Sequence, residues 1–241
     1  MGKIKTVILC GGKGTRMGSD ELPKVLFPIG GKPILWHIMS IYSHFGFNDF
    51  ILCLGYKGEK IREYFSSQNK WKITFAETGE NTNTGGRIKK IKKFIKEDYF
   101  LATYGDGVAD INLTELVKFH EKHKKSATIT VARPLSQFGI VGVDPHTQSV
   151  THFEEKPVLD HWINSGFFVF NKDIFDYLKE NDILERDSFK RILEDKELNA
   201  FKHAGFWRCM DTYKDNLELN ELWKKNKAAW KIWRNNEYLE K

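Results

Sequence analysis

The residues best suited to phosphate chemistry form a glycine-rich loop, Gly11-Gly12-Lys13-Gly14-Thr15-Arg16, directly after the apolar run 6–10. Glycines let backbone amides approach a polyphosphate closely, and an arginine can hold phosphate oxygens with two hydrogen bonds. The loop lacks the third glycine of GxGxxG, because Met17 occupies that position, and the pattern GxxxxGK[ST] is absent. Taken alone, the loop could also be a turn that merely needs glycine.

Three charged residues elsewhere fit the same chemistry. Lys24, in Leu-Pro-Lys-Val-Leu, follows the loop closely enough to neutralise a triphosphate, although a solvated lysine is the alternative. Asp106 lies between two glycines after the expected strand 99–103, a place that suits a Mg²⁺ ligand or, alternatively, an Asp-Gly turn. Asp211 follows the largely apolar stretch 206–210, where a carboxylate normally has a partner or a metal.

Two motifs in the second half suit a phosphorylated acceptor. In Glu-Glu-Lys-Pro, Lys156 offers a positive charge to an acceptor phosphate and Glu155 can accept hydrogen bonds from hydroxyl groups. Plain surface charge is the alternative for this motif. Asn164 and Gly166 lie in Asn-Ser-Gly, which opens the apolar run 167–170.

The pattern of apolar residues predicts the elements that hold these motifs. Apolar runs predict strands at 6–10, 50–54, 72–76, 99–103 and 127–132, and helical periodicity predicts helices at 33–45, 58–65, 84–95 and 112–123. This alternation predicts an α/β fold with a Rossmann-like, mostly parallel sheet covered by helices on both faces. Ligands bind beyond the carboxyl ends of such strands, so the glycine loop and Asp106 should meet in one crevice.

After residue 133 the pattern changes. Strands at 140–143, 150–154 and 162–170 have turn-rich links, which favour antiparallel pairing in an acceptor-binding region. Helices are expected at 173–178 and 187–193, and a final helix from Thr212 onwards carries Trp223, Trp230 and Trp233. We see no linker, so a single domain 1–241 is expected, in which residues 1–133 bind the nucleotide and residues 134–241 bind the acceptor and form the C-terminal helix.

Composition narrows the class of protein. The 38 basic and 32 acidic residues leave a net charge of +6, which suits nucleic acid, a membrane surface or small anions. The lysines at 89–96 alternate with apolar residues, as on the wet face of an amphipathic helix, and no interleaved aromatics indicate RNA binding. No apolar run is long enough for a transmembrane helix, and three cysteines without CxxC spacing indicate neither a disulfide framework nor a zinc site. We expect a cytoplasmic protein that binds neither nucleic acid nor membrane.

Six motifs, in order along nearly the whole chain, resemble the sugar-1-phosphate nucleotidyltransferase family: GGKGTR, LPK with GGKP, GDG, EEKP, NSGFFVF and the late Asp211. GGKPILWHIM, GYKGEKIREYF, TGGRIK, ATYGDGVADIN and FWRCMDT are most similar to its glucose-1-phosphate cytidylyltransferase branch. The resemblance implies transfer of CMP from CTP to a sugar 1-phosphate, with Mg²⁺ as cofactor. It implies that Gly11, Gly12, Gly14, Thr15, Arg16 and Lys24 hold the triphosphate, that Thr84, Gly85 and Arg87 lie by the base, that Asp106 and Asp211 bind Mg²⁺, and that Glu155, Lys156, Asn164 and Gly166 hold the sugar phosphate. Arg16, Lys24 and Lys156 are then the catalytic cations.

The chain departs from that branch in two places. The segment between Phe65 and Thr84 is shorter, and LPKVL replaces a different lysine-proline run. We therefore expect a more open base site, or one covered by the C-terminal helix, and self-association into a homo-oligomer through that helix. UTP or dTTP as donor, another acceptor, a non-catalytic nucleotide sensor and a nucleic-acid-binding module are the alternatives. Two aspartates suited to metal, Asp106 and Asp211, argue against the sensor.

Overall fold

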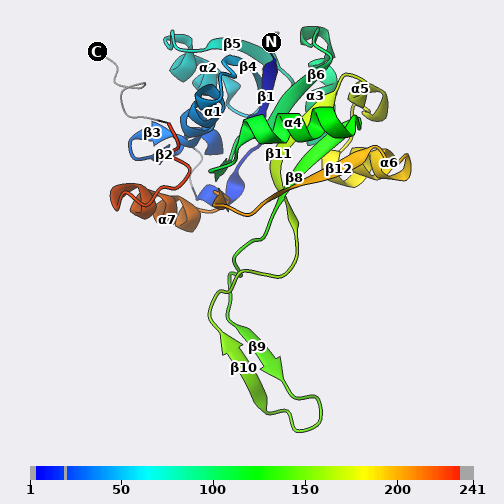
Figure 1. The fold of residues 1–241 in the computed structure, drawn as a ribbon. Helices are drawn as coiled ribbons and strands as arrows, with labels where there is room; N and C mark the ends of the chain where they lie inside the picture. The colour runs from blue at the N-terminus through cyan, green and yellow to red at the C-terminus, as the bar shows by residue number, and fades with distance from the viewer. Residues whose placement is uncertain (1–3, 19–20, 234–241) are drawn as a thin grey trace.

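A seven-stranded sheet forms the centre of the computed structural model, which describes residues 4–18 and 21–233 (Figure 1). Its strands, in spatial order, are β12 (Leu198–His203), β8 (Ala127–Ala132), β11 (Ile163–Asn171), β6 (Tyr99–Tyr104), β1 (Lys5–Leu9), β4 (Asp49–Leu54) and β5 (Lys72–Glu77). β11 pairs antiparallel with both β6 and β8, and every other pair is parallel. The central strands β1, β4 and β6 are mostly apolar and mostly buried, as expected for a sheet covered on both sides.

Helices cover both faces of this sheet, so the predicted fold class is confirmed. Alternate residues of β1 point to opposite faces: Ile8 joins one apolar core, and Val7 and Leu9 join the other. The first core includes residues of α1 (Ile34–His44), α2 (Gly58–Ser66) and α4 (Leu113–His123). The second includes residues of α3 (Thr84–Lys90), α5 (Ile174–Tyr177) and α6 (Phe189–Glu194). Strands from 1–133 and from 134–241 share the sheet, and the single-domain division stays a prediction.

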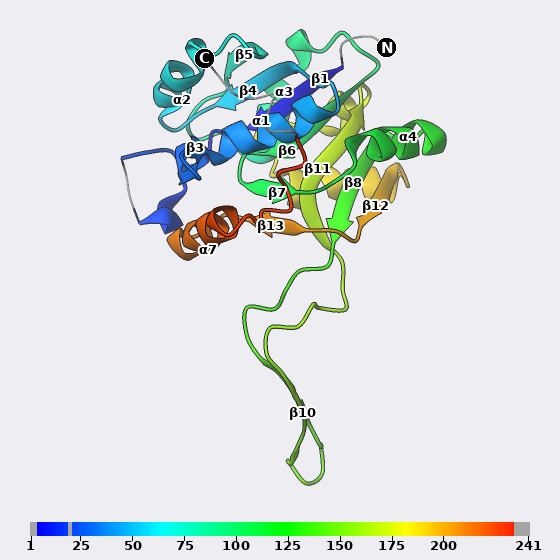
Figure 2. The same cartoon turned by 60° about the vertical axis from the view of Figure 1, so that its left-hand side comes forward.

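Short elements surround the carboxyl edge of the sheet. The single turns η1 (Thr15–Met17) and η2 (Lys24–Leu26) follow β1, and a small hairpin, β2 (Pro28–Ile29) with β3 (Lys32–Pro33), precedes α1. β7 (Gly107–Ala109) pairs antiparallel with β13 (Trp207–Cys209), a pairing that the sequence did not predict. α7 (Tyr213–Lys224) lies beside this pair (Figure 2).

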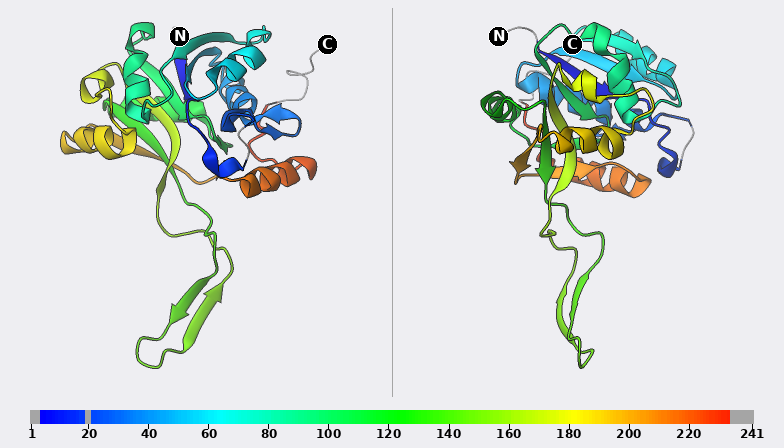
Figure 3. Two further views of the ribbon diagram at one scale, coloured as in Figure 1. Left: turned by 180° about the vertical axis from the view of Figure 1, so that it is seen from behind. Right: turned by 90° about the vertical axis from the view of Figure 1, so that its right-hand side faces the viewer.

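A two-stranded arm, residues 134–162, leaves the body between β8 and β11 and projects far from it (Figures 1 and 3). Its distal portion is the antiparallel pair β9 (Ile140–Val143) and β10 (Val150–Glu154). β11 is antiparallel to both β8 and β6, so β8 and β6 run in the same direction. β1 is parallel to β6 and therefore also runs in the direction of β8. The arm therefore leaves from the same edge of the sheet at which the glycine loop follows β1.

The prediction of one long C-terminal helix is wrong. α7 ends at Lys224, because Asn226 adopts a left-handed conformation (φ 54°) and the Lys227 amide closes the last turn on the Leu222 carbonyl at 2.8 Å. Trp230 is fully buried and Trp233 is 5 % exposed. Both belong to the chain's own core, so they offer no free surface for self-association.

Three smaller differences concern the second face of the sheet. The helix expected at 84–95 ends at Lys90, and a single turn, η3 (Lys92–Phe94), follows it. The strand β12 was not expected, and the helix expected at 187–193 begins as a π-helical turn, η4 (Leu184–Ser188), before α6. Within the described ranges no helix is long and apolar enough to cross a membrane.

Candidate active site

A cavity of about 630 Å³ opens at the carboxyl edge of the sheet, where the strand-end motifs meet. It brings together most of the residues that the sequence assigned to nucleotide and metal: Gly11, Gly12, Gly14, Thr15, Arg16, Lys24, Thr84, Arg87, Asp106 and Asp211. The segment 80–83 supplies the wall next to Thr84. None of the described lining residues belongs to α7. The cavity is therefore bordered next to Thr84 by the shortened segment between Phe65 and Thr84, and not by the C-terminal helix.

Arg87 lies beneath the glycine loop, 4 % exposed. Its Nη1 donates to the Leu54 carbonyl (3.1 Å) and to Thr78 Oγ1 (2.6 Å), and its Nη2 donates to the carbonyls of Gly11 (2.9 Å) and Glu80 (3.1 Å). A Cβ on Gly11 would clash with this guanidinium, which explains why glycine is needed there. Burial lowers the pKa of Arg87. The side chain thus joins the loop to the strand β4 and the segment 78–80.

Lys24 stands between the two aspartates. Its Nζ lies 2.5 Å from Asp106 Oδ2 and 2.8 Å from Asp211 Oδ1, and Arg16 Nη2 lies 3.4 Å from the same Asp211 oxygen. Burial alone would lower the pKa of Lys24, but the charge and hydrogen bond of Asp106, then those of Asp211, outweigh it and raise that pKa. Partial burial opposes ionisation of Asp211, but Lys24 and Arg16 prevail and lower its pKa. Lys24 and Asp211 are therefore both charged at neutral pH.

Backbone contacts fix the two carboxylates against each other. Asp106 lies in the turn between β6 and β7, and the Met210 amide donates to its carbonyl at 2.8 Å. Asp211 follows β13 and precedes α7, whose first turn is closed by a reciprocal cap between Thr212 and Asp215. The pairing of β7 with β13 thus brings together aspartates that are far apart in the sequence.

The donor set fits a divalent cation. One ligand atom each from Asp106, Cys209 and Asp211 lies within 4.8 Å of the others. Lys24 Nζ already places a positive charge between the carboxylates, which shows that this point of the cavity accommodates a cation. Carboxylate oxygens suit Mg²⁺, whereas a cysteine sulfur suits softer metals. Cys209 was not predicted here, although its place two residues before Asp211 was a usable signal.

Comparison with known proteins decides the family. The family model described as nucleotidyl transferase matches residues 5–226. The chain belongs to this family. It is 45 % identical over 256 residues to a Bacillus subtilis protein named as a probable glucose-1-phosphate cytidylyltransferase, covering 95 % of this chain and 100 % of that one. It is 42 % identical over 259 residues to the Salmonella typhimurium glucose-1-phosphate cytidylyltransferase, with 95 % and 100 % covered. The resemblance expected from the motifs is confirmed.

The fold agrees with that family. A solved UDP-glucose pyrophosphorylase in complex with UDP-glucose superposes with a TM-score of 0.72 at 16 % identity, covering 92 % of this chain and 99 % of that one. At this identity the likeness concerns the fold alone. The family match makes the chain a nucleotidyltransferase, so the enzyme class expected from the sequence is confirmed.

None of the four residues assigned to the acceptor lines the cavity of this nucleotidyltransferase. Glu155 and Lys156 lie on the arm, exposed, with Lys156 Nζ 3.9 Å from Glu155 Oε1. Asn164 Oδ1 accepts from the Gly166 amide at 3.0 Å, within β11. Gly166 has φ 83° and lies against the ring of Tyr104, which lines the cavity, so its missing side chain makes room for that wall.

The wall of the cavity at Thr84 is tied to a distant turn. Thr84 Oγ1 accepts from the Leu184 amide (2.8 Å) and donates to Glu185 Oε2 (3.2 Å), and the Gly85 amide donates to the Asp182 carbonyl (3.0 Å). The Tyr104 hydroxyl donates to the other oxygen of Glu185. Sequence reasoning missed Tyr104 and Glu185. Tyr104 directly precedes the Gly-Asp-Gly motif and could have been found, whereas nothing local marks Glu185.

Proposed function

We propose that the protein transfers CMP from CTP to glucose 1-phosphate, giving CDP-glucose and pyrophosphate. The observation that carries the proposal is the cluster of Lys24, Asp106 and Asp211 beside a glycine loop, which suits a metal-bound triphosphate. The names of the Bacillus subtilis and Salmonella typhimurium relatives supply the donor and the acceptor. An enzyme that uses CTP and a sugar phosphate is expected in the cytoplasm, where we place it.

The reaction needs positioning and charge neutralisation more than proton transfer. An oxygen of the acceptor phosphate attacks the α-phosphorus of CTP in line, the bond between the α-phosphorus and its bridging oxygen breaks, and pyrophosphate leaves. The acceptor phosphate is already anionic near neutral pH, so no strong general base is required. Lys24 and Arg16 stabilise the charge that develops on the triphosphate, and the amides of Gly11–Arg16 hold it in place.

Mg²⁺ is the cofactor that we propose for this cluster. Asp106 and Asp211 would hold it, and it would supply charge neutralisation at the phosphate oxygens. The ammonium of Lys24 would then leave its place between the carboxylates and turn to the phosphates. We propose that Thr84 and Gly85 border the base, with Arg87 beneath the loop, and that Glu155, Lys156, Asn164 and Gly166 serve the acceptor.

Pyrophosphate release measured for all four ribonucleoside triphosphates and dTTP against a panel of sugar 1-phosphates tests the proposal. We expect turnover with CTP and glucose 1-phosphate well above every other pair. Fast turnover with UTP or dTTP would replace the donor, and fast turnover with another sugar would replace the acceptor. Nucleotide binding without turnover for any pair would make the protein a sensor.

A further inference from the structure

The turn 180–188 is fixed to the first residues of α3, beside the cavity. The amides of Gly85 and Gly86 both donate to the Asp182 carbonyl, at 3.0 and 3.2 Å. A Cβ on either glycine would clash with the turn, so this close approach requires glycine. The turn contains the π-helical residues of η4, a rare geometry that is frequent at functional sites. It therefore holds Glu185, the second residue of η4, at the wall of the cavity.

Glu185 accepts the hydroxyl protons of two residues that line the cavity. Its Oε1 accepts from Tyr104, and its Oε2 accepts from Thr84 at 3.2 Å. A carboxylate has no proton to give, so the hydroxyl is the donor in both contacts. Thr84 Oγ1 also accepts from the Leu184 amide (2.8 Å), which leaves one of its lone pairs unused. Toward a ligand, both hydroxyls can therefore only accept a hydrogen bond.

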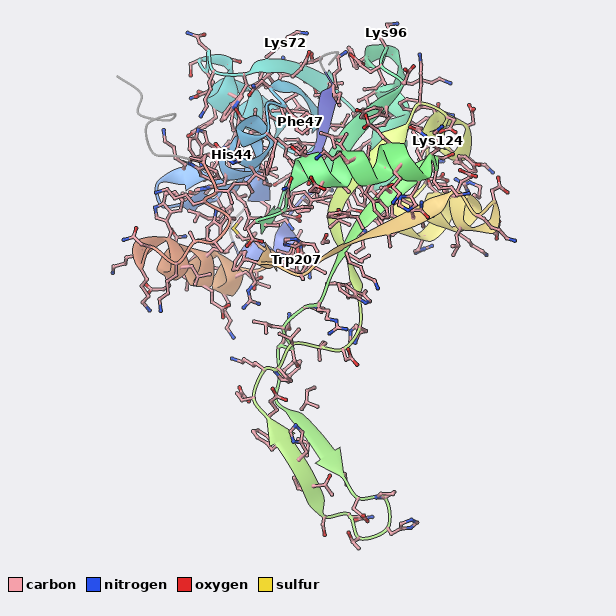
Figure 4. The ribbon with its side chains drawn as sticks, viewed as in Figure 1. His44, Phe47, Lys72, Lys96, Lys124 and Trp207 are labelled. Atoms are coloured by element: carbon pink, nitrogen blue, oxygen red, sulfur yellow. The ribbon has the colours of Figure 1, made fainter. Side chains whose placement is uncertain are left out.

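Packing fixes the ring of Tyr104, so its hydroxyl stays beside the carboxylate. A Cβ on Gly166 would clash with this ring on one side, and Phe168 contacts it edge-on with the ring centroids 5.3 Å apart. Trp207, at the same edge of the sheet (Figure 4), donates its indole N–H to the Ser165 carbonyl at 2.8 Å and so holds the strand next to that glycine. The direction of the Tyr104 hydroxyl is thus set by the fold.

The other hydroxyl and the guanidinium on this side of the cavity have also used their protons. Thr82 Oγ1 donates to the Thr78 carbonyl at 2.6 Å, and each terminal nitrogen of Arg87 donates twice. The amides of Asn81 and Asn83 carry both a donor and an acceptor, so they favour neither kind of ligand group. Among the described side chains of this wall, Tyr104 and Thr84 therefore decide the polarity, and both present acceptors.

We propose that Glu185 makes this wall select a ligand group that donates hydrogen bonds, and that this group is the 4-amino group of cytosine. UTP and dTTP present a carbonyl oxygen at that position, which would face lone pairs and remain unpaired. Sugar hydroxyls can donate or accept, so the wall would not distinguish one sugar from another. Glu185 is a positioning residue, because it acts through Tyr104 and Thr84. The inference rests on the proposed function, which places the base beside Thr84.

Glu185→Gln tests the inference with a change of one atom. The glutamine amide can donate to the two hydroxyls, which frees their protons for a carbonyl oxygen of the ligand. We expect the ratio of kcat/KM for CTP to that for UTP to fall by about tenfold or more. Glu194→Gln makes the same change at an exposed position at the end of α6 and should keep the wild-type ratio. A purely structural role of Glu185 would lower kcat/KM for both nucleotides alike and leave the ratio unchanged.

Two further measurements identify the group that is recognised. The triphosphate of pyrimidin-2-one riboside keeps the N3 acceptor of cytosine but lacks the amino group, so the wild type should bind it about tenfold or more weaker than CTP. In Glu185→Gln this difference should shrink. Tyr104→Phe removes one acceptor and should lower the CTP-to-UTP ratio by itself, and Glu185→Gln should then have a smaller effect in the Tyr104→Phe background, because the two residues act together.

The outcomes separate this inference from the proposed function. If the wild type prefers CTP and Glu185→Gln keeps that preference, the inference is overturned and the proposed function stands. A rise in the KM for glucose 1-phosphate alone places Glu185 with the acceptor and also overturns it. Absence of CTP turnover by the wild type rejects the proposed function. Calorimetric binding of CTP and UTP needs no turnover, and a wild type that binds both equally well overturns the inference.

Discussion

Arg87 donates a hydrogen bond from Nη2 to the main-chain oxygen of Gly11 at 2.9 Å, across 76 positions of the sequence. The same guanidinium holds Leu54, Thr78 and Glu80, so each terminal nitrogen already makes two hydrogen bonds. An arginine engaged in this way supports the loop, whereas the family resemblance placed Arg87 by the base. The two roles have different consequences for substitution.

We expect Arg87→Lys to lower the free energy of unfolding by about 2–4 kcal/mol, because a lysine cannot replace the planar fork and leaves buried carbonyls unpaired. The KM values for CTP and UTP should rise by the same factor, since we assign the loop to the triphosphate and not to the base. Thermal unfolding and steady-state kinetics measure both effects. Arg62→Lys is the matched control, because Arg62 is exposed and donates to the exposed carboxylate of Glu77. A folded Arg87→Lys enzyme that loses only its choice between CTP and UTP would mean that Arg87 reads the base.

Asp106→Asn and Asp211→Asn should each lower kcat by about a hundredfold or more while the fold persists. Each change removes one of two carboxylates that we assign to Mg²⁺, and loss of a metal ligand costs roughly 3 kcal/mol or more of transition-state stabilisation. Pyrophosphate release, with circular dichroism as the check on folding, measures this. Asp195→Asn, an exposed aspartate away from the cavity, should retain wild-type kcat. Near-normal kcat in either cavity variant would remove that aspartate from the mechanism.

Removing Lys24 should strengthen Mg²⁺ binding in the absence of nucleotide. The ammonium of Lys24 neutralises Asp106 and Asp211 at 2.5 and 2.8 Å, so a metal must displace it. Lys24→Ala leaves two carboxylates facing each other without a cation, which lowers the free energy of unfolding in the absence of metal. Added Mg²⁺ relieves that repulsion, so it stabilises the variant by a larger amount. We expect a larger Mg²⁺-induced rise in Tm for Lys24→Ala than for the wild type, together with a lower kcat. The double variant with Asp106→Asn should abolish that rise. An unchanged Mg²⁺ response would place the metal elsewhere.

Much of the cavity could be predicted from the sequence because its residues follow strands. Gly11–Arg16 and Asp106 come directly after apolar runs, and the carboxyl ends of parallel strands meet at one edge. Their convergence therefore follows from the order of elements alone. Asp211 was found because a carboxylate beside an apolar stretch needs a partner, although the pairing of β7 with β13 that positions it has no local signal.

The rest depends on contacts between distant segments. The motif with Glu155 and Lys156 is readable, but the direction of the arm that carries it is set by the ladder between 134–136 and 157–159. The tryptophans at 230 and 233 had helical spacing, yet the turn at Asn226 sends them back into the core. The acceptors of Arg87 are three main-chain carbonyls and one hydroxyl, and such acceptors leave no pattern in the sequence. Nothing in the sequence therefore indicated that Arg87 supports the loop.

Cys209 should make the proposed metal site sensitive to thiophilic cations. Its sulfur lies within 4.8 Å of ligand oxygens from Asp106 and Asp211, and thiolate ligands favour Zn²⁺ and related soft metals over Mg²⁺. We expect Cd²⁺ or Zn²⁺ to inhibit the Mg²⁺-supported reaction, and Cys209→Ser to need about tenfold more of either metal for the same inhibition. Co²⁺ should give a sulfur-to-metal charge-transfer band with the wild type and none with Cys209→Ser. Cys53→Ser, a fully buried thiol away from the aspartates, is the control. Equal sensitivity of Cys209→Ser and the wild type would show that the sulfur of Cys209 is not a metal ligand.

The stability of the core should fall as the pH drops from about 6.5 towards 4, and His37 should cause much of that fall. His37 is fully buried: its Nε2 donates to the Ile29 carbonyl at 2.8 Å, and its Nδ1 accepts from Trp230 Nε1 at 3.4 Å. Burial, helped by the charge of Lys231 and opposed by the backbone hydrogen bonds at Ile29 and Lys32, lowers the pKa of His37 to about 4. A proton on Nδ1 would also face the indole N–H, so the folded protein keeps this ring neutral.

The direction of the pH effect follows from which state binds the proton. Between pH 6.5 and 4 the unfolded chain takes up a proton at His37 that the folded chain refuses, so the stabilisation is complete above pH 6.5 and is lost on acidification. The shift from 6.5 to about 4 corresponds to roughly 3 kcal/mol over that window. Burial also lowers the pKa of His120, so the wild type alone does not isolate the effect. His37→Gln keeps an amide donor but does not titrate, and its unfolding free energy, measured with urea at several pH values, should fall less steeply. His44→Gln, at an exposed position, should keep the wild-type slope. A wild-type slope in His37→Gln would show that His37 does not control the acid stability of this core.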